Sequence, residues 1–407
     1  MLRVPIEKAK SGMSLAMPVR NPQASDRYLL SSGYDLNETI VGRLKQMGVR
    51  EVVVRYPGLE VLSQFIDGEV LEKRAEIAKT LSDVLERSQA QATAKLDYDT
   101  YLKQMAALVE QMLQNPSALL FIEEVSHDAP WLLEHSTTVS FLSLLMGMKL
   151  DWYLMKQRKR LPPRHAREVG SLGVGAMLHD IGMLDLEQGV LERYKQTGDV
   201  SDPAWRAHVR LGYERVRGQI DPTAAVVVLD HHQHFDGTGF PARRDPAGGR
   251  MTLKGEAIHI FARVTTVADT FATLREPYGG TKQPTVRAIR RMLGEPYVRW
   301  LDPFVLRSFL AVVPPFAPLK PVQLNDGRWA VPVDHSPDDP CRPTVQVIPG
   351  PSPNDAPQGG NEPPKMLDLR EHAHLHVAHA EGEDVAADNF APPRIAGNMT
   401  DLAAAYS

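Results

Sequence analysis

Apolar residues recur with helical spacing through the middle of the chain. Between Leu62 and Gln114 they form two stripes, each on one face of a predicted helix. The stripes are Ile77, Leu81, Val84 and Leu85, then Met105, Leu108, Val109 and Met112. From about residue 116 to 318 the spacing continues in helical segments, two of which open on Asp-Pro pairs typical of a helix start. The pattern predicts a mainly α-helical fold.

The two ends of the chain have short apolar runs separated by turn signals. Residues 1–62 contain such runs around one predicted helix, Asp35 to Met47, and predict a small α+β module rich in β structure. After Pro321 two short strands flank Asp326-Gly327, a pair typical of a hairpin turn. From Pro349 onward Pro, Gly, Asn and Asp dominate, which predicts a disordered tail.

These patterns divide the chain into five segments. They are an N-terminal β-rich regulatory module (1–62), a helical linker (63–115), a helical domain (116–318), a C-terminal β segment (319–348) and a disordered tail (349–407). The linker is expected to pack on the helical domain. A dimerising helical hairpin, and with it a homodimer, is the less favoured alternative because the apolar repeats are short for a coiled coil.

Composition narrows the class of protein. The formal net charge of −4 gives no support to electrostatic binding of a nucleic acid polymer or a membrane surface. No apolar run approaches the ~20 residues that span a bilayer, and the N-terminus lacks the pattern of a signal peptide. Cys341 is the single cysteine, so no intramolecular disulfide forms. We therefore expect a cytoplasmic protein without membrane insertion.

The central candidate for chemistry is the stretch Leu178-His179-Asp180-Ile181-Gly182. A neutral imidazole and a carboxylate follow an uncharged apolar run, and together they are a ligand pair for divalent metals. A metal is one physical reason to keep a carboxylate there, because a buried acid without a partner is costly. A helix end followed by Gly182 is the alternative interpretation of this stretch taken alone.

Four more histidines belong to neighbouring predicted helices. His135 follows the apolar line of the helix that begins near Pro130, and His208 lies on a later helix. His231 and His232 directly follow another apolar helix. A single buried histidine is most often a core residue, but five in one helical domain favour a common site.

Asp269 adds a second buried acid. It is the one charged residue between Arg263 and Arg275, on a helix predicted from about Gly255 to Leu274 whose two faces both look buried. Five histidines and two acids suit a dinuclear centre bridged by Asp180. Two metals ~3.5–4 Å apart suit displacement at phosphorus, because they activate water and neutralise phosphate oxygens. The mixed ligands fit Fe, Mn or Zn.

The motifs HDIGM at 179–183 and HHQHFDGTGFP at 231–241 resemble those of the HD-GYP family, a branch of the HD phosphohydrolase superfamily. The resemblance covers roughly 116–318, and the N-terminal segment resembles the small module that often precedes this domain in bacteria. It implies a bacterial phosphodiesterase in second-messenger signalling, which opens cyclic di-GMP to pGpG and then GMP. The implied cofactors are two divalent metal ions, of which Fe and Mn are favoured.

The resemblance also implies roles for individual residues. One metal is assigned to His135, His179, Asp180 and Asp269, and the other to Asp180, His208, His231 and His232. The catalytic pair is then His179 and Asp180. The loop Gly237-Thr238-Gly239 is tight, can approach a ligand closely, and matches the GYP signature that shapes the substrate site and is linked to partners such as diguanylate cyclases.

Several positions depart from the family pattern. Met183 replaces a lysine that holds a substrate phosphate, Gln233 replaces a glutamate, and Phe240 replaces the tyrosine of GYP. Losing that lysine removes a charge-assisted hydrogen bond of ~1.5–3 kcal/mol, which predicts reduced activity. Arg275, or an arginine of the basic insert 156–167, is the expected substitute for it in binding substrate.

The sequence leaves three functions open. A metal-containing cyclic di-GMP phosphodiesterase of reduced activity is favoured, with two metals because Trp131 stands where some members have a third-metal glutamate. The second is a receptor or scaffold that binds cyclic di-GMP or a signalling partner without turnover, and it is motivated by the departures. The third is an HD hydrolase acting on another nucleotide.

Overall fold

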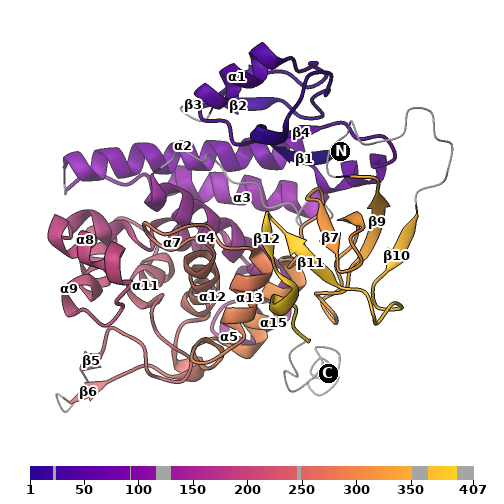
Figure 1. Cartoon of the computed structure of the whole chain (residues 1–407). Helices are drawn as coiled ribbons and strands as arrows, with labels where there is room; N and C mark the ends of the chain where they lie inside the picture. Colours follow the sequence, from indigo (N-terminus) through magenta and orange to yellow (C-terminus); the bar gives the residue numbers. More distant parts are fainter. Residues whose placement is uncertain (22–23, 92, 116–129, 245–248, 351–364, 392–407) are drawn as a thin grey trace.

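The helices that carry the two histidine motifs lie together, with a small N-terminal module above them and a C-terminal sheet at one side (Figure 1). The computed structural model describes residues 1–21, 24–91, 93–115, 130–244, 249–350 and 365–391. The predicted fold class, mainly helical with minor sheets, is confirmed. No helix among the described residues is both long and apolar enough to cross a membrane.

Four helices form the centre of the helical domain. They are α4 (Trp131–Lys149), α7 (Gly170–Leu178), α11 (Pro222–Asp230) and α12 (Ile260–Arg275). α4 packs against α7 and α12, and α7 packs against α11. Because α4 has neighbours on several sides, most of its length is buried and its apolar residues do not keep to one stripe.

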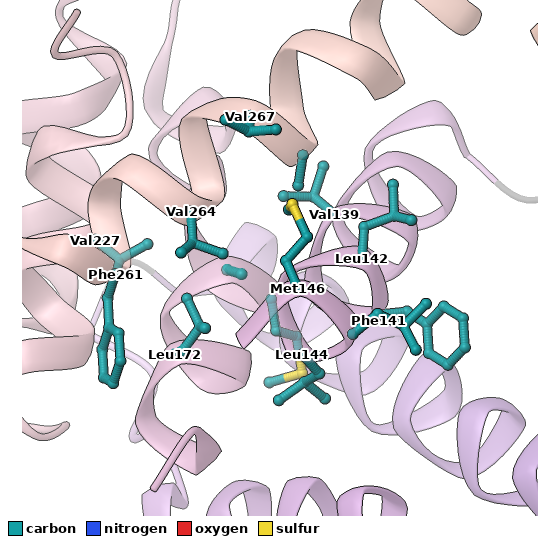
Figure 2. Packing of buried hydrophobic residues seen from close by; sticks show 14 of the residues in the cluster. Val139, Phe141, Leu142, Leu144, Met146, Leu172, Val227, Phe261, Val264 and Val267 are labelled. Atoms are coloured by element: carbon teal, nitrogen blue, oxygen red, sulfur yellow. The ribbon is translucent and has the colours of Figure 1, made fainter. Parts of the chain in front are cut away.

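The space between these helices is filled by aliphatic and aromatic side chains (Figure 2). Val139 and Met146 of α4, Leu172 of α7, and Val264 and Val267 of α12 are all fully buried. Burying each such side chain contributes about 1.5–3 kcal/mol before entropy is counted. This packing fixes the helices, and with them the polar residues at their ends.

The other helices of the domain surround this centre. They are α5 (Asp151–Gln157), α6 (Pro163–Ala166), α8 (Gln188–Thr197), α9 (Pro203–Arg206), α10 (His208–Val216), α13 (Thr285–Met292), α14 (Tyr297–Trp300) and α15 (Pro303–Val312). A short antiparallel pair is formed by β5 (Arg243–Arg244) and β6 (Arg250–Met251).

α12 begins at Ile260 rather than at the predicted Gly255. Gly255 has a φ of +57°, which is not helical, and the His259 side chain accepts a hydrogen bond from Phe261 N at the helix start.

The helical linker consists of α2 (Gly68–Ala90) and α3 (Tyr98–Gln114), which pack against each other. α2 also contacts α4, and α3 contacts α7. The two predicted apolar stripes face the helical domain. Leu81 and Met105, one from each stripe, are fully buried in the same core cluster as residues of α4 and α7. The linker therefore packs on the helical domain, as expected.

The N-terminal module combines two small antiparallel sheets with one helix. β1 (Leu2–Pro5) pairs with β4 (Glu51–Val54), and β2 (Val19–Asn21) pairs with β3 (Ala24–Leu30). Helix α1 (Glu38–Gln46) is capped by Asn37, whose side chain accepts a hydrogen bond from Ile40 N. The core of the module continues into the C-terminal part of the chain through Leu319, Val331 and Ile348.

The C-terminal part is a six-stranded antiparallel sheet in the order β10-β9-β8-β7-β11-β12. Its strands are β7 (Val322–Leu324), β8 (Trp329–Pro332), β9 (Thr344–Ile348), β10 (Met366–Asp368), β11 (Val377–Ala380) and β12 (Glu383–Asp384). The predicted hairpin is β7–β8. The predicted disordered tail is wrong for residues 365–391, because Leu369, Leu375 and Val377 bury their side chains in the core of this sheet. The rest of that tail, 351–364 and 392–407, lies outside the described residues.

Candidate metal centre

His179 and Asp180 lie where α7 ends and a 3-10 turn, η4 (Ile181–Asp185), begins. Both side chains are buried. Gly182 allows this turn to approach α10: a Cβ at that position would lie 2.0 Å from the His208 carbonyl oxygen. Any side chain here would push the turn away from His208, so the glycine of the motif keeps the two elements of the site together.

Three of the histidines are oriented in the same way. Each places ring Nδ1 near a backbone carbonyl three residues earlier in the chain. The pairs are His179 with Ala176 O at 2.7 Å, His208 with Trp205 O at 2.7 Å, and His231 with Val228 O at 3.0 Å. The carbonyl must accept, so Nδ1 carries a proton and Nε2 is the ring nitrogen that faces the centre, as in metal-ligating histidines.

The two carboxylate oxygens of Asp180 face two different groups. Oδ1 lies 3.4 Å from Nε2 of His208 and 3.5 Å from Nε2 of His231. Oδ2 lies 3.4 Å from Nε2 of His179 and 3.7 Å from Nε2 of His135. A single side chain therefore connects two sets of ligands, which is the arrangement of a bridging carboxylate.

Asp269 closes the site from the opposite side. It projects from α12, with Oδ1 at 3.1 Å from Nε2 of His135 and Oδ2 at 3.7 Å from Nδ1 of His232. On α4, the ring of Trp131 stacks on His135 with their centroids 4.3 Å apart. All seven side chains predicted as ligands are thus brought together from separate elements.

These side chains fit metal ions by their donor chemistry. Asp180 Oδ1, His208 Nε2 and His231 Nε2 are buried and have no hydrogen-bond partner among the described residues. The Nε2 atoms of His135 and His179 lie 3.2 Å apart, both aimed at the same space. Buried polar atoms are normally paired, so a cluster of unsatisfied acceptors indicates a site suited to a cation. Two groups have metal-ligand spacing: Asp180 with His208, His231 and His232, and His135 with His179 and Asp269.

The charges within the cluster set the protonation states. Burial lowers the pKa of His208 to about 4, and burial together with the charge of His231 brings the pKa of His232 well below its usual value. For His179, burial is outweighed by the charge and hydrogen bond of Asp180 and the charge of Asp269, which raise its pKa to about 9. In the metal-free protein at pH 7, His208 and His232 are therefore neutral and His179 is protonated.

Metal uptake should accordingly release a proton from His179, because a ligating imidazole must be neutral. We expect the apparent affinity for Mn²⁺ to rise about tenfold per pH unit from near pH 7 up to about pH 9, where the free His179 loses its proton by itself. Titration calorimetry in two buffers of different ionisation enthalpy measures the released protons. An affinity that is flat across this pH range would contradict the prediction.

A cavity of about 690 Å³ opens beside the cluster and reaches His232 and Asp269. Its lining is rich in aromatic rings and in cations. The rings are Tyr194, Trp205, Phe240, Tyr278, Tyr297 and Trp300, and the cations are Lys195, Arg206, Arg291 and Arg299. Lys195 and Arg291 form no ion pair with a residue that the structure describes. The cavity therefore offers positive charge and flat apolar surfaces next to the predicted ligands.

The glycine loop forms part of this cavity through Thr238. Gly237 has a φ of +87°, and a Cβ at Gly239 would lie 2.3 Å from His234 N and 2.4 Å from His232 O. The Gly239 position thus brings the loop backbone against the backbone of the predicted ligand His232. Gly237 and Gly239 act by shaping the loop, and of the three predicted loop residues Thr238 is the one at the cavity.

Arg275 does not line this cavity, and its role as the substitute for the missing lysine stays a prediction. Its guanidinium pairs with Glu381 of the C-terminal part, and it lines two other cavities, one of which also reaches His135. The basic insert is also absent from the lining of the cavity at His232 and Asp269. Arg158, for example, donates to the carbonyls of His165 and Ala166.

The residues that depart from the family pattern have structural roles. Met183 is 5% exposed and does not line the cavity. Gln233 is buried and donates through Nε2 to the carbonyl of Pro241 at 2.7 Å, holding the loop closed. Phe240 stacks on His232 with ring centroids 4.7 Å apart. Gln233 thus supports the loop, and Phe240 supports His232, a predicted ligand beside it.

Sequence reasoning missed the cavity cations Lys195, Arg206 and Arg291. They lie on α8, α9 and α13, far apart in the chain and mostly exposed, so no local pattern marks them. Trp205 was missed as well, although its position three residues before His208 is a recognisable signal. Its carbonyl orients that histidine, and its ring lies 4.6 Å from the imidazole.

The fold and the cluster define a helical domain built around a histidine–aspartate site suited to metal ions. Residues 120–305 match the family model of the HD domain, so the chain contains an HD domain. HD-domain phosphohydrolases depend on metals, in agreement with the donor set found here. The resemblance to the HD-GYP branch is confirmed by this match together with similar proteins named for the same chemistry.

Curated relatives match part of the chain. A cyclic di-GMP phosphodiesterase of Pseudomonas aeruginosa, PA4108, is 28% identical over 230 residues, which cover 54% of this chain and 48% of that protein. A 3'3'-cGAMP-specific phosphodiesterase of Vibrio cholerae is 25% identical over 252 residues, 60% of this chain and 47% of that protein. The chain thus spans about half the length of these two relatives. A solved structure, the HDG"Y"P protein Bd1817 of Bdellovibrio bacteriovorus, aligns with 76% of this chain and 97% of its own at 18% identity and a TM-score of 0.43.

Proposed function

We propose that this chain is a metal-dependent phosphodiesterase that hydrolyses cyclic di-GMP to pGpG or GMP in bacterial second-messenger signalling. The observation that carries the proposal is a double ligand cluster, bridged by Asp180, that opens on a cavity of about 690 Å³ lined with cations and aromatic rings. We assign the cluster two divalent ions, Fe or Mn, and place the protein in the cytoplasm, as expected from its sequence.

The ligand assignment follows the two carboxylate oxygens of Asp180, each of which lies near a different group of histidines. His135, His179 and Asp269 would hold one ion together with Oδ2, and His208, His231 and His232 would hold the other together with Oδ1. Divalent ions at such a pair of sites supply an activated water and neutralise phosphate oxygens. The carbonyls of Ala176, Trp205 and Val228 keep three imidazoles in the required tautomer.

The cavity supports a dinucleotide substrate by charge and by shape. A cyclic dinucleotide presents two phosphates and two purines, and the cavity volume is within the range of small-molecule sites. Lys195, Arg206 and Arg291 would bind phosphate oxygens through charge-assisted hydrogen bonds. Tyr278 and Trp300 offer ring faces for stacking the bases. The same cations supply the charge that Met183 does not, which favours turnover over a receptor without activity.

Arg291 provides the sharpest test, because its neighbour is a natural control. Arg291 lines the cavity, whereas Arg290 on the same helix lies 3.7 Å from Asp388. Arg291→Gln should lower kcat/KM for cyclic di-GMP about tenfold to a hundredfold through the lost charge-assisted bond. Arg290→Gln should leave it within about twofold, since exposed ion pairs contribute little.

The assay follows the conversion of cyclic di-GMP by chromatography, on anaerobic protein loaded with Fe or Mn. 3'3'-cGAMP is run in parallel to define the substrate. If cyclic di-GMP stays intact for hours while calorimetry detects that it binds, the protein is a receptor and not a phosphodiesterase. If neither cyclic di-GMP nor 3'3'-cGAMP is hydrolysed but another nucleotide is, the protein is an HD hydrolase with a different substrate. Equal losses in the two arginine variants would refute the role of Arg291.

A further inference from the structure

Tyr194 of α8 lines the cavity of about 690 Å³ together with His232 and Asp269. It is partly buried, whereas the residues on either side of it, Arg193 and Lys195, are exposed. Its hydroxyl makes no hydrogen bond with a residue that the structure describes. Polar groups in such places normally have a partner, so the hydroxyl is a donor that a ligand of the cavity can use.

The ring of Tyr194 is held by two other aromatic rings. It stacks on Trp205, with centroids 4.4 Å apart and planes inclined by 21°. The ring of Tyr278 is nearly parallel to it, at 6.2 Å and 17°. Trp205 belongs to α9, which packs beside α8 (Figure 1), and Tyr278 lies in the turn that follows α12. Packing against two rings restricts the Tyr194 ring and gives its hydroxyl a defined position.

The turn after α12 also fixes the next residue of α8. Gly279 has a φ of +71°, and a Cβ at this position would lie 2.3 Å from Cγ of Lys195. The Lys195 side chain therefore crosses the turn where a side chain of residue 279 would otherwise stand. Two consecutive residues, Tyr194 and Lys195, thus dock α8 on the turn and line the same cavity.

Tyr194 lies close to the metal centre. The ring of Trp205, on which it stacks, has its centroid 5.2 Å from that of His232. Burial raises the pKa of Tyr194, and the charges of Asp269 and then Asp180 raise it further. These are the two carboxylates of the predicted ligand cluster. The hydroxyl is therefore at the border between the cluster and the cavity.

We propose that the Tyr194 hydroxyl donates a hydrogen bond to an oxygen of the phosphate that binds at the metal centre. The inference rests on the proposed function and adds a substrate-binding residue to it. A tyrosine hydroxyl is protonated at neutral pH and donates without adding charge. Lys195 supplies a charge from the next position, so α8 contributes a neutral donor and a cation to one anion.

A purely structural role for Tyr194 makes a different prediction. Stacking on Trp205 and Tyr278 uses the ring and not the hydroxyl. Tyr194→Phe keeps the ring and removes only the donor. A packing residue would tolerate this change without an effect on ligand binding, whereas a phosphate donor would not.

The test uses the full chain loaded with Mn²⁺ and inorganic phosphate as the probe. Relaxation of water protons by the bound Mn²⁺ changes when phosphate replaces water on the ion, so a titration gives the dissociation constant at the metal centre. Tyr194→Phe should raise this constant about tenfold, through the loss of a hydrogen bond to a charged group. Its metal content should equal that of the wild type.

Tyr213→Phe is the matched control. Tyr213 lies on α10 and packs at the edge of the main core, but it is not part of the lining of this cavity. Its loss of a hydroxyl should leave the dissociation constant for phosphate within about twofold. Equal constants in the wild type and Tyr194→Phe would overturn the inference, and so would equal losses in the two variants.

GMP as a second probe identifies the part of the ligand that the hydroxyl contacts. A bond to phosphate predicts that Tyr194→Phe weakens the binding of phosphate and of GMP by the same factor. A loss confined to GMP would assign the hydroxyl to the nucleoside and overturn the inference.

Phosphate binding is measured without turnover, so it is separate from the test of the proposed function. Weaker phosphate binding by Tyr194→Phe in a protein that leaves cyclic di-GMP intact would support the inference and refute the phosphodiesterase. With turnover, Tyr194→Phe should act mainly by raising KM, because the bond already forms in the bound substrate. A change confined to kcat would contradict a role in holding the bound phosphate.

Discussion

Asp180→Asn should abolish metal binding at both halves of the cluster and reduce phosphodiesterase activity by about a thousandfold or more. Each oxygen of Asp180 faces a different histidine pair, at 3.4 and 3.5 Å on one side and at 3.4 and 3.7 Å on the other. Asparagine keeps the shape but replaces one oxygen by an NH₂ group, which cannot ligate a cation, and removes the negative charge. Metal analysis of the purified variant measures the effect.

A neighbouring carboxylate supplies the control. Asp185 lies at the end of the same 3-10 turn, but it pairs with Arg215 and not with a histidine. Asp185→Asn should therefore retain the metal content of the wild type. If Asp180→Asn also retained it, the bridging role would be refuted. If both variants lost metal, the loss would reflect a disturbed turn rather than a missing ligand.

The ligand cluster was predictable because each ligand has a local signal. His179 and Asp180 follow an apolar helix, His231 and His232 follow another, and Asp269 is the one charged residue between Arg263 and Arg275 on a helix that proves buried. Polar residues in such places need partners, and helices of one domain bring their ends together. Their relative placement, with one Asp180 oxygen toward each group, depends on helix packing that no local pattern encodes.

The folded C-terminal segment changes the surroundings of Arg275, a residue predicted to bind substrate. Proline, glycine and polar residues after Pro349 predicted disorder, although Leu375-His376-Val377-Ala378 alternates between more and less buried positions as a strand does. Because that segment is folded, Glu381 reaches Arg275, a residue 106 positions earlier, and occupies the guanidinium that the sequence had assigned to substrate. A contact of that sequence separation leaves no signal at either residue.

The cations of the metal-site cavity were missed for a related reason. Lys195 and Arg291 are exposed and lie in helices whose sequences are ordinary for a protein surface. Only the fold places them beside His232 and Asp269. Exposed lysines and arginines are common on protein surfaces. The proposed role of Lys195 and Arg291 therefore rests on their meeting at one cavity and not on their residue type.

The largest effect on stability is expected at Asp302, which is buried and pairs with the buried Arg263 of α12. Tyr153 donates to Asp302 Oδ2 at 2.9 Å, and the backbone N of Phe304 donates to Oδ1 at 2.9 Å at the start of α15. Asp302→Ala would leave the Arg263 charge buried without its carboxylate and remove a helix cap. We expect the free energy of unfolding to fall by about 3–5 kcal/mol, measured by denaturant unfolding.

The exposed pair Arg299–Glu295 is the matched control for this network, because it also joins an arginine to a carboxylate but lies in solvent. Glu295→Ala should change the free energy of unfolding by only about 0.5 kcal/mol. The double variant Arg263→Met with Asp302→Ala should be more stable than Asp302→Ala alone, since it removes the unpaired charge. Since Arg263 lies on the helix that presents Asp269, Asp302→Ala should also weaken metal binding. A single variant as stable as Glu295→Ala would show that the buried pair does not anchor α12.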